Sequence, residues 1–564
     1  MKVVIVGGVA GGASAAARLR RLNEKAEILI FEKTGFVSYA NCGLPYYIGG
    51  VIQDKGELLL KTPESFWTRF HITVKVHTKV LSVNRDAKTV TVKDLTTGEE
   101  WDEPYDKLIL SPGARAVLPP LPGIDNPKIF TLRTVEDTFR IHDFITASQP
   151  KSAVVIGGGF IGLEMAENLV EKGISVTILE MQSQLMTTFD SDMASFIHNR
   201  LRQAGISLRL NTGAAGFEDR DGKIVTLLKN DTALTADMVI MAAGVAPDSS
   251  LAKDAGLRTG IRGSIYTDDH MMTSDEDIYA VGDAVQVKHF VTGSDALISL
   301  AGPANKQGRI AADNICGIDS TYIGSLGSSV IKLFDLTAAS TGLTERAAKA
   351  AGIDCESVVL GPMSHAGYYP GAKALTMKVV FERGSLRILG AQVIGAEGAD
   401  KRIDVIATAI QAGMQAHKLK NLDLAYAPPY SSAKDPVNMA GFMIENISKG
   451  LMKQYHAEDV DTLPRDGSVT LLDTRTAEEY GRGHADGYIN IPLDELRERL
   501  SEVDKTRPVY VMCHSGLRSY IACRILSENG FDSYNFSGGY RFYATVTQER
   551  CLIRSATACG MDQK

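Results

Sequence analysis

The chain has 564 residues, a length that exceeds one hydrophobic core and predicts three or four domains. Its composition, with 44% hydrophobic and 23% charged residues, is typical of a soluble globular protein. A formal net charge of −7 argues against nucleic-acid binding, because phosphate contacts need a basic surface. The sequence also contains no apolar run of ~18 residues that would predict a membrane span.

The cysteines indicate the cellular compartment. Seven of them are scattered along the chain, in an odd number and without the spacing of a zinc site. We therefore expect free thiols, a reducing compartment and no metal centre. The amino terminus runs directly into a strand and leaves no room for a signal peptide. Together these features predict a cytoplasmic protein.

The first elements form a dinucleotide-binding pattern. An apolar strand at residues 3–6 is followed by the glycine-rich turn 7–12, an alanine-rich helix and a second strand over 27–31 that ends at Glu32. Glycines in such a turn let backbone amides approach a pyrophosphate at the start of the helix, and the acid accepts hydrogen bonds from ribose hydroxyls. Val9 replaces the middle glycine of the motif, but the acid stands at the expected distance.

A single cysteine follows, in the stretch 38–47. A redox partner spaced C-x4-C from Cys42 would stand at position 47, which is Tyr47. Cys42 therefore has no disulfide partner nearby in the sequence, and if it is redox active, its partner sulfur comes from a bound molecule. The alternative is a cysteine that only packs in the core, and the order of the surrounding motifs argues against it.

The dinucleotide pattern then recurs. Strand 153–156 precedes the turn 157–162, in which all three motif glycines are present, and a second strand over 175–179 ends at Glu180. Two such units predict two dinucleotide sites. Glu180 would accept hydrogen bonds from the 2′- and 3′-hydroxyls of an adenosine ribose and would repel a 2′-phosphate. Because no arginine follows it, NADH is favoured over NADPH.

Three more buried strands, at 107–114, 238–244 and 277–284, end in small or acidic residues. The third ends in Gly282-Asp283, and this acid could bond a ribityl hydroxyl or organise a phosphate. An ordinary turn aspartate is the alternative interpretation. The place of the segment after two dinucleotide units favours the first.

The order of glycine turn, lone cysteine, second glycine turn and Gly-Asp segment resembles the two-dinucleotide-binding disulfide reductases of the glutathione reductase type. Within them, the stretch 38–46 is similar to coenzyme A-disulfide reductase, and the resemblance extends from residue 1 to about 445. It implies that FAD binds at Gly7, Gly12, Glu32 and Asp283, and NADH at Gly157, Gly159, Gly162 and Glu180. The further cofactor-binding residues that it implies are Gly8, Ala10, Gly11, Lys33, Ser111, Gly113, Phe160 and Gly244.

The sequence pattern of residues 320–445 differs from that of the dinucleotide-binding units. The resemblance implies that this region is a dimerisation domain, whose residues complete the active site of a second subunit. Tyr368 and Tyr426 match positions that act from the partner chain. A phenol, with an ordinary pKa of ~10, could donate a proton or a hydrogen bond to a leaving thiolate. Aromatic packing is the alternative, and Tyr369 and Tyr430 leave the register open.

The resemblance also implies that coenzyme A binds, as a substrate or as a tightly bound group. Its 3′-phospho-ADP end requires cations. Residues that match substrate-contact positions of the family or supply cations near the flavin turn are Ser14, Arg18, Arg21, Ser38, Asn41 and Lys434. Phe70 stands where some relatives carry a cation that contacts the coenzyme A phosphates.

A second sulfur motif begins after Met452. Cys513 stands between the apolar strand 509–512 and a helix, where a nest of backbone amides and the helix dipole lower the thiol pKa and cradle an added sulfur. Arg518 adds a fixed positive charge. Residues 455–555 are similar to a rhodanese, whose cysteine carries a persulfide. The alternatives are an inactive rhodanese fold and a phosphatase-like loop, although the spacing C-x4-R is shorter than the C-x5-R of phosphatases.

The predicted fold class is α/β, with two Rossmann-like dinucleotide-binding domains of the glutathione reductase type, an α+β dimerisation domain and a C-terminal α/β rhodanese domain. The expected boundaries are 1–150 and 261–320 for the FAD-binding domain, 151–260 for the NAD(H)-binding domain, 321–450 for the dimerisation domain and 455–555 for the rhodanese domain.

The resulting hypothesis is a homodimeric flavoprotein that reduces persulfides and polysulfides, coenzyme A persulfide included, with electrons passing from NADH through FAD to sulfur at Cys42. Cys513 would collect sulfane sulfur, and the expected catalytic residues are Cys42, Cys513, Tyr368, Tyr426 and Arg518. One alternative is a coenzyme A-disulfide reductase with a passive rhodanese domain. Others are a sulfur carrier or redox sensor, and a peroxidase or oxidase that works through a sulfenic acid.

Overall fold

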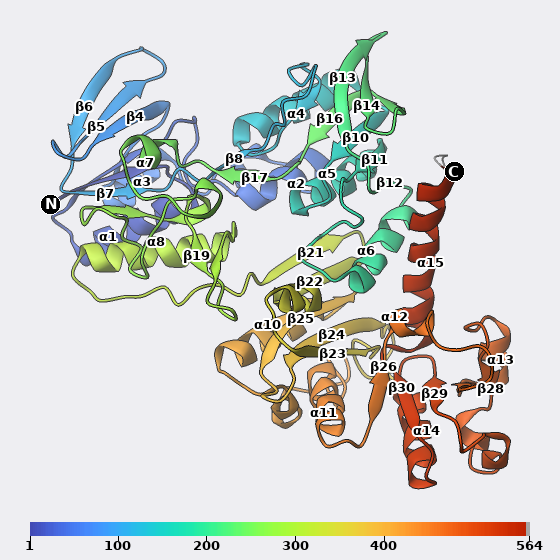
Figure 1. Cartoon of the computed structure of the whole chain (residues 1–564). Coiled ribbons are helices and arrows are strands. Elements are labelled where there is room, and N and C mark those ends of the chain that lie inside the picture. Colours follow the sequence, from blue (N-terminus) through green and yellow to red (C-terminus); the bar gives the residue numbers. More distant parts are fainter. Residues whose placement is uncertain (560–564) are drawn as a thin grey trace. The chain divides into compact units, whose positions relative to one another are not determined.

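The computed structural model describes residues 1–559, with side chains up to residue 553 (Figure 1). The chain divides into two compact units. The first comprises Met1–Gln182 and Gly205–Gly327, and the second comprises Ser183–Ala204 together with the chain from Ser328 onward. None of the helices among the described residues is both long enough and apolar enough to cross a membrane.

The first unit contains two parallel five-stranded sheets. In the first sheet, of order β18-β7-β1-β2-β3, the strands are β1 (Lys2–Val6), β2 (Glu27–Phe31), β3 (Thr73–Lys75), β7 (Lys107–Leu110) and β18 (Ile278–Ala280). In the second, of order β12-β11-β10-β16-β9, they are β9 (Ile129–Phe130), β10 (Ser152–Ile156), β11 (Ser175–Leu179), β12 (Ser207–Arg209) and β16 (Met238–Met241). Strands buried on both faces read as continuous apolar runs, as they do here.

The helices of the first unit follow the glycine turns. They are α1 (Ala10–Leu22), α2 (Leu44–Gly49), α3 (Pro63–Phe70), α4 (Val135–Ser148), α5 (Phe160–Glu171), α7 (Ser250–Asp254) and α8 (Ala301–Ile315). Helix α8 lies so close to α1 that a Cβ atom at Gly308 would be 2.3 Å from the carbonyl oxygen of Gly11. Only glycine permits this approach, which places side chains of α8 beside the first glycine turn.

Small antiparallel sheets complete the first unit. They pair β4 (Thr78–Asn84), β5 (Thr89–Asp94) and β6 (Glu100–Pro104); β13 (Ala214–Arg220), β14 (Lys223–Leu228) and β15 (Ala233–Ala236); β8 (Ala114–Ala116) and β17 (Val245–Pro247); and β19 (Val287–Lys288) and β20 (Asp295–Ala296).

The second unit contains an antiparallel sheet and a parallel one. The antiparallel sheet, of order β21-β22-β25-β24-β23, consists of β21 (Ser329–Leu333), β22 (Leu336–Gly342), β23 (Cys355–Leu360), β24 (Leu375–Glu382) and β25 (Ile388–Gly395). The parallel sheet, of order β26-β30-β29-β27-β28, consists of β26 (Lys453–Tyr455), β27 (Thr470–Asp473), β28 (Ile489–Asn490), β29 (Val509–Met512) and β30 (Ser533–Phe536). The predicted α/β class with an α+β insertion is confirmed by this topology.

The helices of the second unit include one that precedes the antiparallel sheet by a long stretch of chain. They are α6 (Ser191–Gln203), α9 (Glu345–Ala350), α10 (Ala399–Gln411), α11 (Pro436–Ser448), α12 (Ala457–Val460), α13 (Ala477–Gly481), α14 (Leu517–Glu528) and α15 (Gly539–Cys559). Cys551 is exposed on α15, and the side chain of Cys559 lies outside the described residues.

Buried polar contacts join the parallel sheet to the antiparallel one. The hydroxyl of Ser537 accepts a hydrogen bond from the backbone N–H of Val359 at 2.9 Å, and the side-chain amide of Gln454 donates to the carbonyl oxygen of Ser357 at 2.8 Å. The guanidinium of Arg541 donates to the hydroxyl of Thr376 at 3.1 Å. Because such groups are costly to leave unpaired, these contacts fix the terminal domain on the sheet.

A buried lysine holds the start of α6 to the antiparallel sheet. The ammonium of Lys378, on β24, lies 2.8 Å from Asp192, 2.9 Å from Glu345 and 3.3 Å from Asp190. Burial alone would lower the pKa of Lys378, but the three carboxylates outweigh it and raise the pKa. The lysine therefore stays charged and compensates the acids that surround it.

Helix α15 lies alongside α6 (Figure 1), and a buried charge cluster joins the two helices. Nε2 of His198 accepts the backbone N–H of Leu185 at 3.0 Å, so Nδ1 carries the proton and donates it to Glu549 Oε1 at 3.0 Å. Arg202 also binds the Glu549 carboxylate, at 3.1 Å to Oε1. Burial would raise the pKa of Glu549, but the bonds from His198 and Arg202 outweigh it and hold this pKa below its usual range.

We predict that Glu549→Ala lowers the stability of the second unit by about 3 kcal/mol, because it leaves the buried His198 and the half-buried Arg202 without their acceptor. The difference from the wild type should be largest above the ordinary carboxyl pKa of ~4.3 and should shrink as the pH falls, because the carboxylate stabilises the fold only when it is charged. The measurement is thermal unfolding at several pH values. Gln548→Ala, at an exposed position of α15, is the control and should change little; equal effects of the two variants would contradict the prediction.

Candidate functional site

The first glycine turn forms a cradle that side chains cannot enter. Gly7 has a φ of +93°, and a Cβ atom on it would lie 2.1 Å from the carbonyl oxygen of Ser111. A Cβ atom at Gly12 would lie 2.0 Å from the carbonyl oxygen of Gly7. The turn therefore presents backbone N–H groups at the start of α1 without side-chain cover, an arrangement that fits a pyrophosphate.

A glutamate at the end of the second strand supports this turn. Glu32 is 5% exposed, and its Oε2 accepts the N–H of Gly8 at 3.0 Å while Oε1 accepts the N–H of Thr34 at 2.9 Å. The Ser111 hydroxyl, at the end of β7, accepts the N–H of Gly12 at 3.1 Å. These contacts bring four sequence-predicted positions together.

The second turn repeats the geometry of the first. Gly157 has a φ of +110°, and a Cβ atom at Gly162 would lie 2.1 Å from its carbonyl oxygen. Glu180 Oε2 accepts the N–H of Gly158 at 2.8 Å, and its Oε1 accepts the N–H of Gln182 at 2.9 Å. Phe160 is the first residue of α5. The same backbone device thus occurs twice, and both copies fit a dinucleotide.

The remaining predicted cofactor residues lie in the first unit. Gly113 and Gly244 have positive φ values, of 72° and 104°, and Ala10 begins α1. A Cβ atom at Gly11 would lie 2.8 Å from the side chain of Val281. Lys33 is exposed and forms an ion pair with Asp248 at 3.1 Å.

Cys42 lies in a 3₁₀ turn, Asn41–Gly43, directly before α2. The thiol is free, as predicted, and the residue is exposed. Partial burial of the thiol, together with the negative charges of Glu164 and Asp283, raises the pKa of Cys42, and Arg133 opposes them. The protein's own charges therefore do not supply the field that would lower this pKa. Arg133 is itself paired with Asp283, at 3.3 Å.

Glu164, on α5, is a site residue that the sequence reasoning missed. Its Oε1 accepts the hydroxyl of Tyr46, on α2, at 3.3 Å. Burial raises the pKa of Glu164 to about 7, with Tyr46 opposing and Glu167 adding to the rise. The signal was present in the sequence, since Glu164 follows Gly162 by two residues and so lies near the start of the helix that the glycine turn opens.

A cavity of about 380 Å³ lies beside the first turn and gathers four of the predicted coenzyme A contacts, Ser14, Arg18, Arg21 and Ser38. Arg18 is already paired with Asp313 at 2.6 Å, so its charge is compensated. Phe70 also lines the cavity, as do three residues that the sequence reasoning missed, Lys61, Asn305 and Arg309. The last two stand one turn apart on α8, a spacing that could have identified them.

Asn41 is exposed next to Cys42 but does not line this cavity. Lys434 is an exposed residue of the second unit.

The two predicted tyrosines lie together in the second unit. The hydroxyl groups of Tyr368 and Tyr426 are 2.6 Å apart, although the residues are 58 positions apart in the sequence. Both are exposed, at 75% and 45%. Tyr369 packs against His365 instead. Of the four candidate tyrosines, Tyr368 and Tyr426 are the pair for which a hydrogen bond between hydroxyl groups is found.

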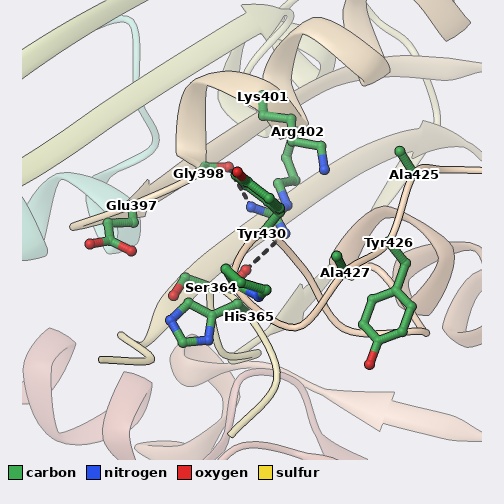
Figure 2. A pocket seen from close by; sticks show the side chains of 11 residues that line it. Ser364, His365, Glu397, Gly398, Lys401, Arg402, Ala425, Tyr426, Ala427 and Tyr430 are labelled. Atoms are coloured by element: carbon green, nitrogen blue, oxygen red, sulfur yellow. Dashed lines mark hydrogen bonds between the residues drawn. The ribbon is translucent and has the colours of Figure 1, made fainter. Parts of the chain in front are cut away.

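A cavity of about 450 Å³ adjoins Tyr426 (Figure 2). Tyr430, His365 and Lys401 line it, together with the buried guanidinium of Arg402. Arg402 Nη2 donates to the carbonyl oxygen of Ser364 at 2.9 Å and lies 3.1 Å from Asp435. Arg402 is therefore fixed and its charge compensated, and it holds the wall of the cavity in place.

Cys513 lies between β29 and α14 and is 1% exposed. Its sulfur accepts the N–H of Gly516 at 3.1 Å and the hydroxyl of Ser519 at 3.2 Å. A Cβ atom at Gly539 would lie 2.5 Å from the carbonyl oxygen of His514, which explains the glycine pair that closes the domain. One backbone N–H and one hydroxyl group therefore point at the sulfur of Cys513.

Arg518 has a different partner from the one expected. Both of its terminal nitrogens bind the carboxylate of Glu479, on α13, at 2.6 and 2.7 Å. These hydrogen bonds outweigh a small effect of burial and lower the pKa of Glu479 to about 2. The positive charge that the sequence assigned to the sulfur of Cys513 is therefore compensated by a second residue that the sequence reasoning missed.

Comparison with known proteins covers nearly the whole chain. Residues 1–308 match the family of pyridine nucleotide-disulphide oxidoreductases, residues 328–436 match the dimerisation domain of these proteins, and residues 456–544 match the rhodanese-like domain. Coenzyme A disulfide reductase of Staphylococcus aureus (strain JH9) is 38% identical over 442 residues, which cover 78% of this chain and 99% of that protein.

Solved structures resemble the chain over its full length. Reduced CoADR-RHD of Bacillus anthracis is 48% identical, with a TM-score of 0.95, and the match covers 97% of this chain and 98% of that one. A NAD-dependent persulfide reductase from A. fulgidus is 38% identical, with a TM-score of 0.91, and the match covers 96% of this chain and 100% of that one. These matches confirm the predicted resemblance and the predicted domain types.

We predict that Glu164→Gln lowers the pKa of the Cys42 thiol, because it removes a negative charge that opposes the thiolate. The effect should be greatest above pH 7, where Glu164 is mostly ionised. The measurement is the rate of iodoacetamide alkylation of Cys42 against pH, read from the Cys42 peptide by mass spectrometry. Glu171→Gln, at an exposed position of the same helix, should leave the profile unchanged. A Glu164→Gln profile that coincides with the wild type would contradict the prediction.

Proposed function

Because this chain belongs to the pyridine nucleotide-disulphide oxidoreductase family, we propose that it is an NADH-dependent reductase of persulfides and polysulfides, coenzyme A persulfide included, and that it releases hydrosulfide. The observation that carries the proposal is the presence of two cysteine sites on one chain. Cys42 is a free thiol before a helix, and Cys513 lies in a loop whose N–H and O–H groups point at its sulfur. One site suits reduction and the other suits sulfur transfer.

FAD would be held at the first turn by the N–H groups between Gly7 and Gly12, with Glu32 and Asp283 as further contacts. NADH would be held at the second turn, with Glu180 facing the adenosine ribose, where its charge would repel a 2′-phosphate. When bound, the flavin supplies two-electron transfer between the nicotinamide and sulfur. The two turns support this assignment because a Cβ atom at Gly7, Gly12, Gly157 or Gly162 would lie 2.0–2.2 Å from a backbone carbonyl oxygen, so these positions stay free of side chains.

Cys42 acts in the proposal as the nucleophile. Its thiolate attacks the carbon-bearing sulfur of a persulfide RS–SH, so that a Cys42–S–S–R bond forms, the RS–SH bond breaks and hydrosulfide leaves. Two electrons then cleave the Cys42 mixed disulfide into the Cys42 thiolate and RS⁻, which takes up one proton. With coenzyme A disulfide, the same attack releases coenzyme A thiolate instead of hydrosulfide.

Tyr368 and Tyr426 would provide this proton from a second copy of the chain. Two hydroxyls 2.6 Å apart form one hydrogen bond between them, which leaves one O–H free to donate outward. That bond also raises the pKa of Tyr426, and so keeps it protonated. Residues 328–436 match a dimerisation domain, which supports a homodimer in which exposed tyrosines complete the partner's site.

Coenzyme A would bind with its phosphates at the cavity beside the first glycine turn. Arg21, Lys61 and Arg309 line this cavity. These residues, from elsewhere in the chain, would replace the cation that some relatives carry at the position of Phe70. Arg18 also lines the cavity, and its charge is shared with Asp313. We also propose that the protein works in the cytoplasm, because every cysteine with a described side chain is a free thiol.

A second candidate function is coenzyme A-disulfide reduction with an accessory terminal domain. The Staphylococcus aureus relative that carries this name is matched over 99% of its length by 78% of the chain, without the rhodanese-like region. The two functions differ in the part that Cys513 takes.

The proposal predicts that Cys42→Ser reduces NADH oxidation with polysulfide to background, because the nucleophile is lost, and that Cys513→Ser lowers it only in part. The measurement is NADH absorbance under anaerobic conditions, with sulfide release as the second readout. A full rate in Cys513→Ser with every sulfur substrate would favour the second candidate. Turnover that persists in Cys42→Ser, or oxygen consumption that matches sulfur turnover, would overturn both.

The coenzyme A assignment predicts that Arg309→Ala raises the KM for coenzyme A disulfide about tenfold, since a charge-assisted hydrogen bond to phosphate contributes roughly 1.5 kcal/mol. The KM for inorganic polysulfide, which has no phosphate, should stay unchanged. Arg69→Ala, at an exposed position of α3 outside the cavity, is the matched control. Equal changes in KM for both substrates would contradict the assignment.

A further inference from the structure

The charges around the Cys513 loop are arranged in pairs. Arg518 follows the loop at the start of α14, and Glu479 binds it through two parallel hydrogen bonds of 2.6 and 2.7 Å. Arg475 lies over the ring of Tyr540, 3.8 Å from its centre, and binds Asp473 at 2.7 Å. A bidentate pair of this kind is geometrically fixed and compensates the guanidinium charge.

One more cation acts on the loop. Arg541 lies close to Ser515, because a Cβ atom at Gly361 would be 3.3 Å from the Arg541 guanidinium and 3.4 Å from the Ser515 side chain. Its Nη2 donates to the backbone of Leu375 and to the hydroxyl of Thr376, so this nitrogen is committed to the antiparallel sheet. His514 adds no charge at neutral pH, because burial lowers its pKa.

The charges that act on the loop therefore sum to about one positive charge: Arg475 with Asp473, Arg518 with Glu479, and Arg541 alone. The Cys513 thiolate that attacks the donor balances this charge, so an incoming donor meets no uncompensated cation. A dianion is therefore disfavoured more than a donor with at most one negative charge, because it loses more hydration without gaining a cation.

We propose that Glu479, by holding Arg518, makes Cys513 selective for a sulfur donor with at most one negative charge, an alkyl persulfide, over the dianion thiosulfate. This inference rests on the proposed function of Cys513 as a sulfur acceptor. Glu479 acts through Arg518 and is a selectivity residue, not a catalytic one.

The transfer step balances for both donors. The Cys513 thiolate attacks the outer sulfur of an alkyl persulfide RS–SH, the Cys513 S–S bond forms, the donor S–S bond breaks and RS⁻ leaves and takes up a proton from water. With thiosulfate the same attack would release sulfite. The thiosulfate dianion would have to enter the loop, and the sulfite dianion would have to leave it. The carboxylate of Glu479, ionised above pH of about 2, opposes the entry of the thiosulfate dianion.

The test compares two donors on the full-length protein. Inorganic thiosulfate and 2-hydroxyethyl persulfide, whose only ionisable group is the persulfide itself, are added separately, the reaction is stopped with iodoacetamide, and the added sulfur on the Cys513 peptide is followed by mass spectrometry. In the wild type we expect faster loading from the alkyl persulfide. Glu479→Gln should raise the ratio of thiosulfate to persulfide loading rates at least tenfold, because it frees the Arg518 charge, while glutamine still serves the cap of α13.

Two further variants make the result specific. Glu478→Gln removes one charge from the neighbouring residue of α13, which pairs with Arg482 on the surface, and should leave the ratio unchanged. Glu479→Asp keeps the charge and should keep the wild-type preference. A ratio that Glu479→Gln does not change, or that Glu478→Gln changes equally, would overturn the inference. A wild-type Cys513 that loads from neither donor would overturn the proposed function instead.

Discussion

A backbone N–H at the start of a helix has no partner within that helix, and the sites of this protein depend on how three such groups are used. The N–H of Gly8 binds Glu32, the N–H of Gly158 binds Glu180, and the N–H of Gly516 binds the sulfur of Cys513. In each case a glycine with positive φ stands in the turn, so the backbone can point these groups outward without a side chain in the way. Two of the turns fit phosphates, and the third fits an added sulfur.

The environments of the two cysteines are set by glutamates in opposite states. Burial raises the pKa of Glu164 to about 7, although the hydroxyl group of Tyr46 donates a hydrogen bond to its carboxylate and opposes the rise. Glu479 has the full fork of Arg518, so its pKa falls to about 2. Glutamate therefore has two roles: Glu164 changes its charge near neutral pH beside Cys42, and Glu479 stays ionised near Cys513. The difference arises because only Glu479 is paired with a cation, Arg518.

The terminal domain is held on the antiparallel sheet by buried contacts on two sides. Hydrogen bonds from Val359 and Gln454 join the sheets, and the cluster of His198, Arg202 and Glu549 joins α15 to α6. A domain fixed in this way keeps Cys513 at a constant place relative to Tyr368 and Tyr426, which lie in the same unit. The terminal domain thus carries Cys513 without a flexible tether to the rest of the second unit.

The local patterns of the sequence determined much of this protein. Each of these patterns can be identified within about 30 residues of sequence, where chain geometry alone sets the spacing. They are the glycine turns, the acids at the ends of the second strands, the lone cysteine and the cysteine at a helix start. Only the tertiary structure decided which charges are compensated: Asp313 pairs with Arg18, and Glu479 pairs with Arg518. It also decided that the side chains of Lys61 and Arg309 line the cavity beside α1. Such pairs join residues from separate elements, and no periodicity records them, because an ion pair depends on where two elements pack and not on their own sequences.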